Sequence, residues 1–169
     1  MSRHQFATEL CSYISIAEDS GKFNNRCFSY VIPKETLKEI EADRTELLKW
    51  GQSKVQGRCT VNMPPWDDEG LCRCYFGAGL GGKPRKAPVF IDADRKVLSK
   101  ETLSSVVQGT KAILIVDQKP WAMTENKVVG TVMHVLGVQI TELVTRDALD
   151  QMRDLSVDEV INLFEEVAK

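Results

Sequence analysis

The sequence predicts a mainly β protein with helical additions (α+β), in which short strands close into a small β-barrel. Short segments either alternate polar and apolar side chains or are rich in β-branched residues, as strands are. Turn residues separate these segments, and helices do not alternate with strands as they do in a parallel α/β sheet. With 169 residues, the chain is long enough to bury a core without disulfides.

Two strands and a long helix are predicted in the first part of the chain. Residues 10–17 alternate polar and apolar side chains, and a turn separates them from a second strand over 26–32. Pro33 begins a helix, because its missing N–H is not needed in the first turn. Leucine and isoleucine then recur at helical spacing among charged residues, so the helix is amphipathic and ends near Gly51 or Gly57.

The middle of the chain is predicted to hold short strands and two loops. A short strand over 58–62 leads into a loop over 63–70, whose prolines and acidic residues leave Trp66 displayed to solvent. The next two strands cover 71–76 and 88–92, and a glycine-rich, basic loop joins them.

A second pair of strands is predicted further along the chain. Residues 98–108 form a short helical turn, and the β-branched segment 110–117 is a strand. A hairpin loop over 120–130 connects it to a long strand over 131–144, which is bent or bulged at Gly137.

The C-terminal segment differs from the rest in charge and pattern. We expect a barrel domain over 1–145 and a separate acidic helical segment over 146–169. Ser156 and Glu159 have the spacing of a capping box at a helix start. The apolar stripe of that helix consists of Val157, Val160, Ile161, Phe164 and Val167.

Composition and charge limit the protein class. The five cysteines are an odd number, and no signal-like or membrane-spanning apolar segment occurs, so we expect a reduced, cytoplasmic protein outside the membrane. The formal net charge is −2, yet the stretch 71–92 carries four basic residues before its first acidic residue, Asp92. A block of this kind attracts polyanions. Its members are Arg73, Lys83, Arg85 and Lys86.

The glycine-rich loop superficially resembles two nucleotide-binding motifs. Its glycines at 77, 79 and 82 match a dinucleotide fingerprint, and Lys83 completes part of a triphosphate-binding loop. The triphosphate motif requires Ser or Thr after the lysine, where this chain has Pro84, and both motifs require a helix that the following residues do not form. We therefore interpret the segment as a hairpin loop whose cations contact phosphates without reading bases.

Metal and catalytic sites have weaker support. A zinc interpretation is invited by Cys59, Cys72 and Cys74, with Cys27 and His134 elsewhere, but no paired C-x2-C motif accompanies them. We favour buried free thiols, a structural role for His134, and no cofactor. No spacing supports a nucleophilic triad, and the carboxylates lie in helices and turns.

Aromatic and basic residues are interleaved on the predicted strands. Rings on which bases stack, combined with a positive groove, hold single-stranded nucleic acid without sequence preference. Arg73 and Tyr75 share one strand face, and Trp121 follows Pro120 near Lys119. A second such face carries Arg26, Phe28 and Tyr30, although we favour core packing for its two rings.

Several short motifs occur in a defined order between Tyr13 and Val144. They are 30–33 before the long helix, 63–67, 73–75, 88–99, 109–111, Pro120-Trp121, Gly130 and 137–144. In this order they resemble the single-stranded DNA-binding proteins of tailed bacteriophages, the type found in podoviruses. That family is built on the oligonucleotide/oligosaccharide-binding (OB) fold, so the resemblance implies an OB-fold-like barrel with a long inserted helix.

The resemblance also implies roles for individual residues. Arg73 would contact the phosphate backbone, and Tyr75 and Trp121 would stack on bases. Charge and placement add four candidate phosphate contacts to these three. They are Lys83, Arg85, Lys86 and Lys111.

The chain departs from the family at two places. Members often carry a second aromatic residue two positions beyond the one after the proline, where this chain has Met123. Many members end in a disordered acidic tail with a terminal aromatic residue. Here Phe164 lies inside an amphipathic segment and Lys169 is last.

We therefore expect a non-enzymatic protein that coats and protects single-stranded DNA during viral DNA replication or recombination. Its partners would be single-stranded DNA, replication proteins that bind the C-terminal segment, and further copies of the chain. One alternative is a replisome adaptor or scaffold that acts through the acidic C-terminal helix. Another, less favoured, is a nucleotide- or metal-dependent enzyme.

Overall fold

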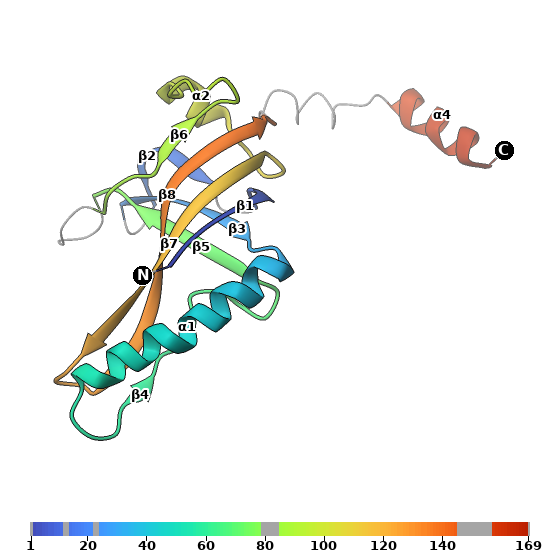
Figure 1. Cartoon of the computed structure of the whole chain (residues 1–169). Coiled ribbons are helices and arrows are strands. Elements are labelled where there is room, and N and C mark those ends of the chain that lie inside the picture. The colour runs from blue at the N-terminus through green and yellow to red at the C-terminus, as the bar shows by residue number, and fades with distance from the viewer. Residues whose placement is uncertain (1, 12–13, 22–23, 79–84, 145–156, 169) are drawn as a thin grey trace.

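Two curled β-sheets and three helices make up the described part of a computed structural model of the chain (Figure 1). The description covers residues 2–11, 14–21, 24–78, 85–144 and 157–168. The strands are β1 (Ser2–Glu9), β2 (Ser15–Ser20), β3 (Asn25–Val31), β4 (Thr60–Val61), β5 (Leu71–Phe76), β6 (Val89–Ile91), β7 (Lys111–Met123) and β8 (Val128–Glu142). The helices are α1 (Lys34–Lys54), α2 (Lys100–Ser105) and α4 (Val157–Ala168).

The larger sheet is organised around β8. This strand pairs antiparallel with β7 along one edge, and on the other edge it pairs parallel with β4 near its start and with β6 near its end. β1 pairs with β7, and the second sheet has the order β2-β3-β5. The sheets curl around a shared core into a half-barrel, which confirms the predicted mainly β, OB-fold-like class (Figure 1).

The core between the sheets is dense in aromatic rings. Phe28 and Tyr30 on β3 are fully buried, with their ring centroids 6.0 Å apart. The ring centroid of Phe90 on β6 lies 6.0 Å from that of Phe28 and also 6.0 Å from that of Phe76 on β5. Core packing, rather than base stacking, is therefore the role of the β3 rings, as the sequence favoured.

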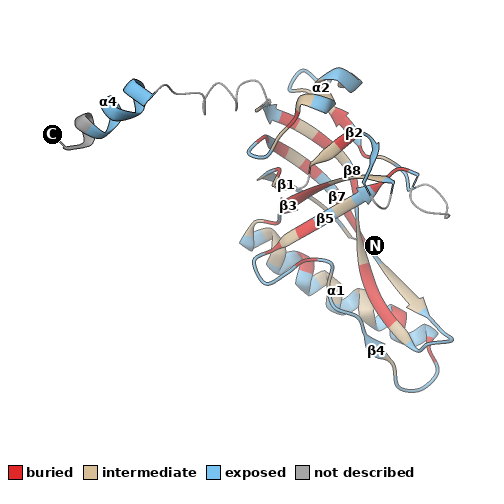
Figure 2. Cartoon of the chain, turned by 180° about the vertical axis from the view of Figure 1, so that it is seen from behind, coloured by how far each residue is buried: buried red, intermediate tan, exposed pale blue. Residues whose placement is uncertain are grey.

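Helix α1 forms where it was predicted, from the residue after Pro33 to Lys54. Its side chain at Ile40 is completely buried, while most of its other residues are partly or fully exposed (Figure 2). The helix lies along one side of β7 and β8, and it also contacts β1, where Nε2 of His4 lies 2.8 Å from Oδ2 of Asp43 (Figure 1).

Several predictions in the loops were wrong. Trp66 is only 7% exposed, because it packs into the core and its backbone pairs with Cys72. The segment 120–130 is not a hairpin loop, because β7 continues to Met123 and β8 already begins at Val128. The predicted bulge is close to its expected place, since Leu136 is skipped in the pairing that places Ile115 opposite Gly137.

The first predicted strand was also misplaced. The structure puts β1 over 2–9, which the sequence did not indicate, and β2 starts only at Ser15. The strands on either side of the basic loop do not pair with each other, because β5 pairs with β3 while β6 pairs with β8. A single bridge between Gly77 and Arg85 joins the ends of that loop.

The five cysteines are free thiols. Within the described ranges, no three residues of the metal-ligating types come together, and no helix is long and apolar enough to cross a membrane. The predicted domain division near residue 145 stays a prediction, since residues 145–156 lie outside the described residues.

A pair of substitutions on β3 tests the position of the core. Phe28→Ala should reduce the free energy of unfolding by about 3–5 kcal/mol, because it leaves a large cavity among three other rings. Tyr30→Phe should change it by less than about 1 kcal/mol, because the Tyr30 hydroxyl lies beside the Cys72 thiol, a weak hydrogen-bonding group. Urea denaturation followed by circular dichroism measures both, and a mild effect of Phe28→Ala would contradict this core.

Candidate functional site

The ends of β7 and β8 extend beyond β1 as an antiparallel ribbon, here called the β7–β8 ribbon and comprising 119–123 and 128–132, and β4 pairs with its β8 edge at Val128 and Val129. Helix α1 covers one of its faces. Nε of Arg44 donates to Oγ1 of Thr131 at 3.0 Å, and Nε2 of Gln118 donates to the carbonyl of Ile40 at 3.0 Å. Gly51 packs against the side chain of Val129 on the same side.

The opposite face of the ribbon is turned away from α1. Successive side chains of a strand point to opposite faces. The residues that directly precede or follow an α1-contacting residue along β7 or β8 therefore point to this opposite face. Lys119 and Trp121 on β7 stand there, opposite Val132 and Gly130 on β8, and His134 follows one step further. We call this surface the open face and define it by Lys119, Trp121, Gly130, Val132 and His134.

Trp121 is partly exposed and lies directly over Gly130, its partner across the ribbon. The sequence predicted it at a hairpin tip. The structure instead places it within a regular ladder, with two further strand residues after it. Its indole is therefore held by a paired strand rather than by a loop.

A buried carboxylate borders the open face without adding free negative charge. Asp117 is 2% exposed, and its two oxygens accept hydrogen bonds from Nε and Nη2 of Arg3 at 2.7 and 3.1 Å. These hydrogen bonds hold the pKa of Asp117 below its ordinary value, with further help from the charges of Arg3 and Lys119. The neighbouring Lys119 is exposed, so the open face keeps a positive character.

His134 is exposed on this face, which corrects the structural role predicted for it. Partial burial lowers its pKa, and the charges of Lys119 and Arg85 lower it further, against the opposing effect of Asp117. The imidazole is therefore mainly neutral at pH 7. The sequence could not indicate this exposure, because only the arrangement of β8 against α1 reveals which side of the strand is open.

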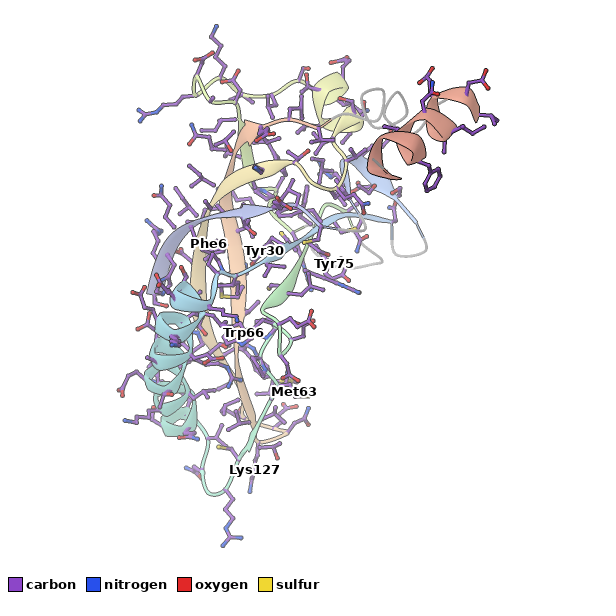
Figure 3. All side chains as sticks on the ribbon, turned by 90° about the vertical axis from the view of Figure 1, so that its right-hand side faces the viewer. Phe6, Tyr30, Met63, Trp66, Tyr75 and Lys127 are labelled. Carbon is purple, nitrogen blue, oxygen red and sulfur yellow. The ribbon has the colours of Figure 1, made fainter. Side chains whose placement is uncertain are left out.

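β5 presents a second exposed row. Cys72 and Phe76 point inward and are buried, so the alternate residues Arg73 and Tyr75 point outward. Tyr75 is 40% exposed and lies on the side of the molecule away from α1 (Figure 3). The predicted shared face of these two residues is thus confirmed.

The end of the basic loop approaches both rows. Arg85 and Lys86 are exposed, and Arg85 is close enough to Cys74 on β5 and to His134 on β8 to lower the pKa of each. The start of the loop is anchored by Asp19, whose Oδ1 accepts a hydrogen bond from the Ala78 amide at 3.3 Å. Lys83 lies outside the described residues.

Two other basic candidates lie elsewhere. Lys111 starts β7, about 33 Å along the strand from Trp121 at the usual rise, and its Nζ is 3.4 Å from Oε2 of Glu142. Arg26 is partly buried. Its Nε lies 3.3 Å from Oδ1 of Asp19, and its guanidinium stacks over the ring of Phe76. The structure therefore gathers Arg73, Tyr75, Trp121, Arg85 and Lys86 on the side away from α1, and separates Lys111 from Trp121.

Searches of the sequence against family models and curated proteins find no match. Solved structures do match in fold. gp2.5, a single-stranded DNA-binding protein encoded by bacteriophage T7, superposes with a TM-score of 0.60 at 14% identity, covering 92% of this chain and 97% of that one. The single-stranded DNA-binding protein of bacteriophage Enc34 superposes with a TM-score of 0.58 at 14% identity, covering 85% of this chain and 83% of its own.

A structure of the Enc34 protein in complex with single-stranded DNA also matches, with a TM-score of 0.53 at 12% identity, covering 83% of this chain and 86% of that one. The agreement extends over most of each chain. The chain therefore has the OB-fold-like fold of bacteriophage single-stranded DNA-binding proteins, as the order of its sequence motifs implied.

Proposed function

We propose that this protein binds single-stranded DNA, nearly independently of sequence, and coats it during replication or recombination of viral DNA inside an infected cell. The observation that carries the proposal is the gathering of an exposed tyrosine, a partly exposed tryptophan and several cations on the side of the fold away from α1. Fold neighbours that are single-stranded DNA-binding proteins support it. The proposed role is non-enzymatic and needs no cofactor.

The exposed ring of Tyr75 and the partly exposed ring of Trp121 supply the contacts to bases in this proposal. Tyr75 on β5 and Trp121 on the ribbon each offer an aromatic surface, and stacking on such a surface tolerates every base. Because the two residues belong to different sheets, they would hold bases at separate points along a bound strand.

Positive charge supplies the contacts to phosphates. Arg73, Arg85, Lys86 and Lys119 are exposed on the same side of the molecule, and Asp117 is neutralised by Arg3, so phosphates meet little repulsion there. Lys83 and Lys111 remain predicted contacts, with Lys111 at the far end of β7.

Substitution of Tyr75 tests the stacking contact. Tyr75→Ala should weaken binding to oligo-dT by about 1–3 kcal/mol, whereas Tyr75→Phe should keep most of the affinity because it retains the ring. Both variants should unfold at the same urea concentration as the unchanged protein, since the side chain is 40% exposed. Fluorescence anisotropy with a labelled oligonucleotide measures the affinity. Equal binding by the Ala and Phe variants would remove Tyr75 from the site.

The salt dependence of binding tests the phosphate contacts. Replacing Arg85 and Lys86 with Gln should flatten the plot of log K against log[salt] by about 0.7 for each phosphate that the protein no longer neutralises. The matched control replaces Lys34 and Lys38 on α1 with Gln and should leave the slope unchanged. Titrations at several NaCl concentrations measure it, and an equal change in both variants would argue against a localised site.

A second candidate function concerns α4, which presents apolar side chains to solvent. Val157, Ile161 and Phe164 lie one turn apart on one side of the helix and are 76%, 49% and 71% exposed. An isolated helix of 12 residues is marginal in water, so such a stripe gains stability by packing against something else. We infer that α4 docks a replication protein or a second copy of the chain. If the protein were an adaptor that binds no DNA, this helix would be its functional part.

Removing residues 146–169 separates the two functions. The truncated chain should keep its fold and its binding to oligo-dT, because the proposed contacts lie in 1–145, and it should no longer associate through α4. In the full chain, Ile161→Asp with Phe164→Asp should abolish that association, and Asn162→Asp on the other side of the helix serves as the control. Sedimentation velocity and oligonucleotide titration report the two properties. A full chain that binds no oligo-dT would favour the adaptor.

A further inference from the structure

The contact between Trp121 and Gly130 is unusually close. A Cβ placed on Gly130 would lie 2.5 Å from Cζ2 of Trp121, 2.7 Å from Cε2 and 3.1 Å from Nε1. Real Cβ atoms essentially never approach another heavy atom within 3.0 Å, so the indole occupies the space that any other side chain at position 130 would need.

Backbone conformation does not explain this glycine. The left-handed glycines of the described chain are Gly21, Gly57, Gly70, Gly77 and Gly109, and Gly130 is not among them. Glycine inside a strand weakens the strand, and it often marks a place where another group approaches closely. Here that group is the indole of the residue paired with it across the ribbon.

The backbone at Gly130 has little room to move away from the indole. The other face of the ribbon is covered by α1, where Gly51 meets Val129 and Arg44 meets Thr131 on either side of Gly130. Lys119 and Met123 flank Trp121 along its own strand. A Cβ at position 130 would therefore push the ring outward, off the surface of the ribbon.

We propose that Gly130 is a positioning residue that sets the orientation of the Trp121 indole on the open face. One side of the ring rests on the backbone of Gly130, and a partly exposed side is offered to a base. A ring already fixed in this way gives up little conformational freedom when a base stacks on it. The inference deepens the proposed single-stranded DNA binding and rests on it for the effect on affinity.

A double-mutant cycle tests the proposal in the full-length chain with oligo-dT as the probe. Trp121→Ala should weaken binding roughly 5- to 150-fold, the range of one stacking contact, and Gly130→Ala should weaken it by a similar factor. In the Trp121→Ala background, Gly130→Ala should cause no additional weakening, since the clash has disappeared. The control is Gly137→Ala on the same strand, where the nearest heavy atom to the new Cβ is 3.8 Å away, and it should bind as the unchanged protein does.

The proposal also has a readout that is independent of DNA. In the unchanged protein, NMR should show nuclear Overhauser effects between the Gly130 Hα protons and Hζ2 of Trp121. The Trp121 indole N–H resonance should shift in Gly130→Ala and stay in place in Gly137→Ala. Absence of the Overhauser effects would overturn the proposal, even if Gly130→Ala failed to fold.

The outcomes separate the inference from the proposed function. Normal affinity of Gly130→Ala alongside a weak Trp121→Ala would overturn the role of Gly130 and leave DNA binding intact. An equal decrease from Gly130→Ala in both backgrounds would show a general effect on the ribbon and also overturn it. An unchanged protein that does not bind oligo-dT, but shows the predicted Overhauser effects, would overturn the proposed function and the effect on affinity while leaving the packing of the ring as described.

Discussion

The packing of α1 on one face of the β7–β8 ribbon determines where this protein can present a binding surface. Two strands alone are marginally stable in water, β4 adds two paired residues at the β8 edge, and the ribbon lies beyond the support of β1. The contacts of Gly51 with Val129, Arg44 with Thr131 and Gln118 with the Ile40 carbonyl supply that support. As a consequence, α1 leaves the opposite face of the ribbon uncovered. The helix, which the chain inserts between β3 and β4, thereby defines the open face.

Much of the fold was predictable because its signals are local. Alternation identified β3 and β5, β-branched residues identified the start of β7, and Pro33 marked the beginning of α1. β1 was missed because Phe6 is its only buried apolar residue. β7 was cut short because Pro120 normally interrupts a strand. Here the proline lies past the last residue paired with β1, where β7 has become an edge strand that tolerates it.

The candidate site was predictable only in part. The shared face of Arg73 and Tyr75 follows from the two-residue period of a strand, which the sequence contains. The exposure of His134 and the burial of Trp66 depend instead on which surfaces distant segments cover, and no local pattern encodes this. The contact between Trp121 and Gly130 depends on the exact register of β7 against β8. The sequence did not define the length of the turn between these strands, so it did not define the register.

The division of the fold into two hydrogen-bonded sheets has a consequence for its cooperativity. Tyr75 belongs to the sheet of β2, β3 and β5, and Trp121 belongs to the sheet built on β8. A single strand of nucleic acid that contacted both Tyr75 and Trp121 would cross from one sheet to the other and would stabilise their relative arrangement. Such a ligand binds only when both sheets are folded and correctly apposed, so occupancy and resistance to unfolding would rise together by mass action.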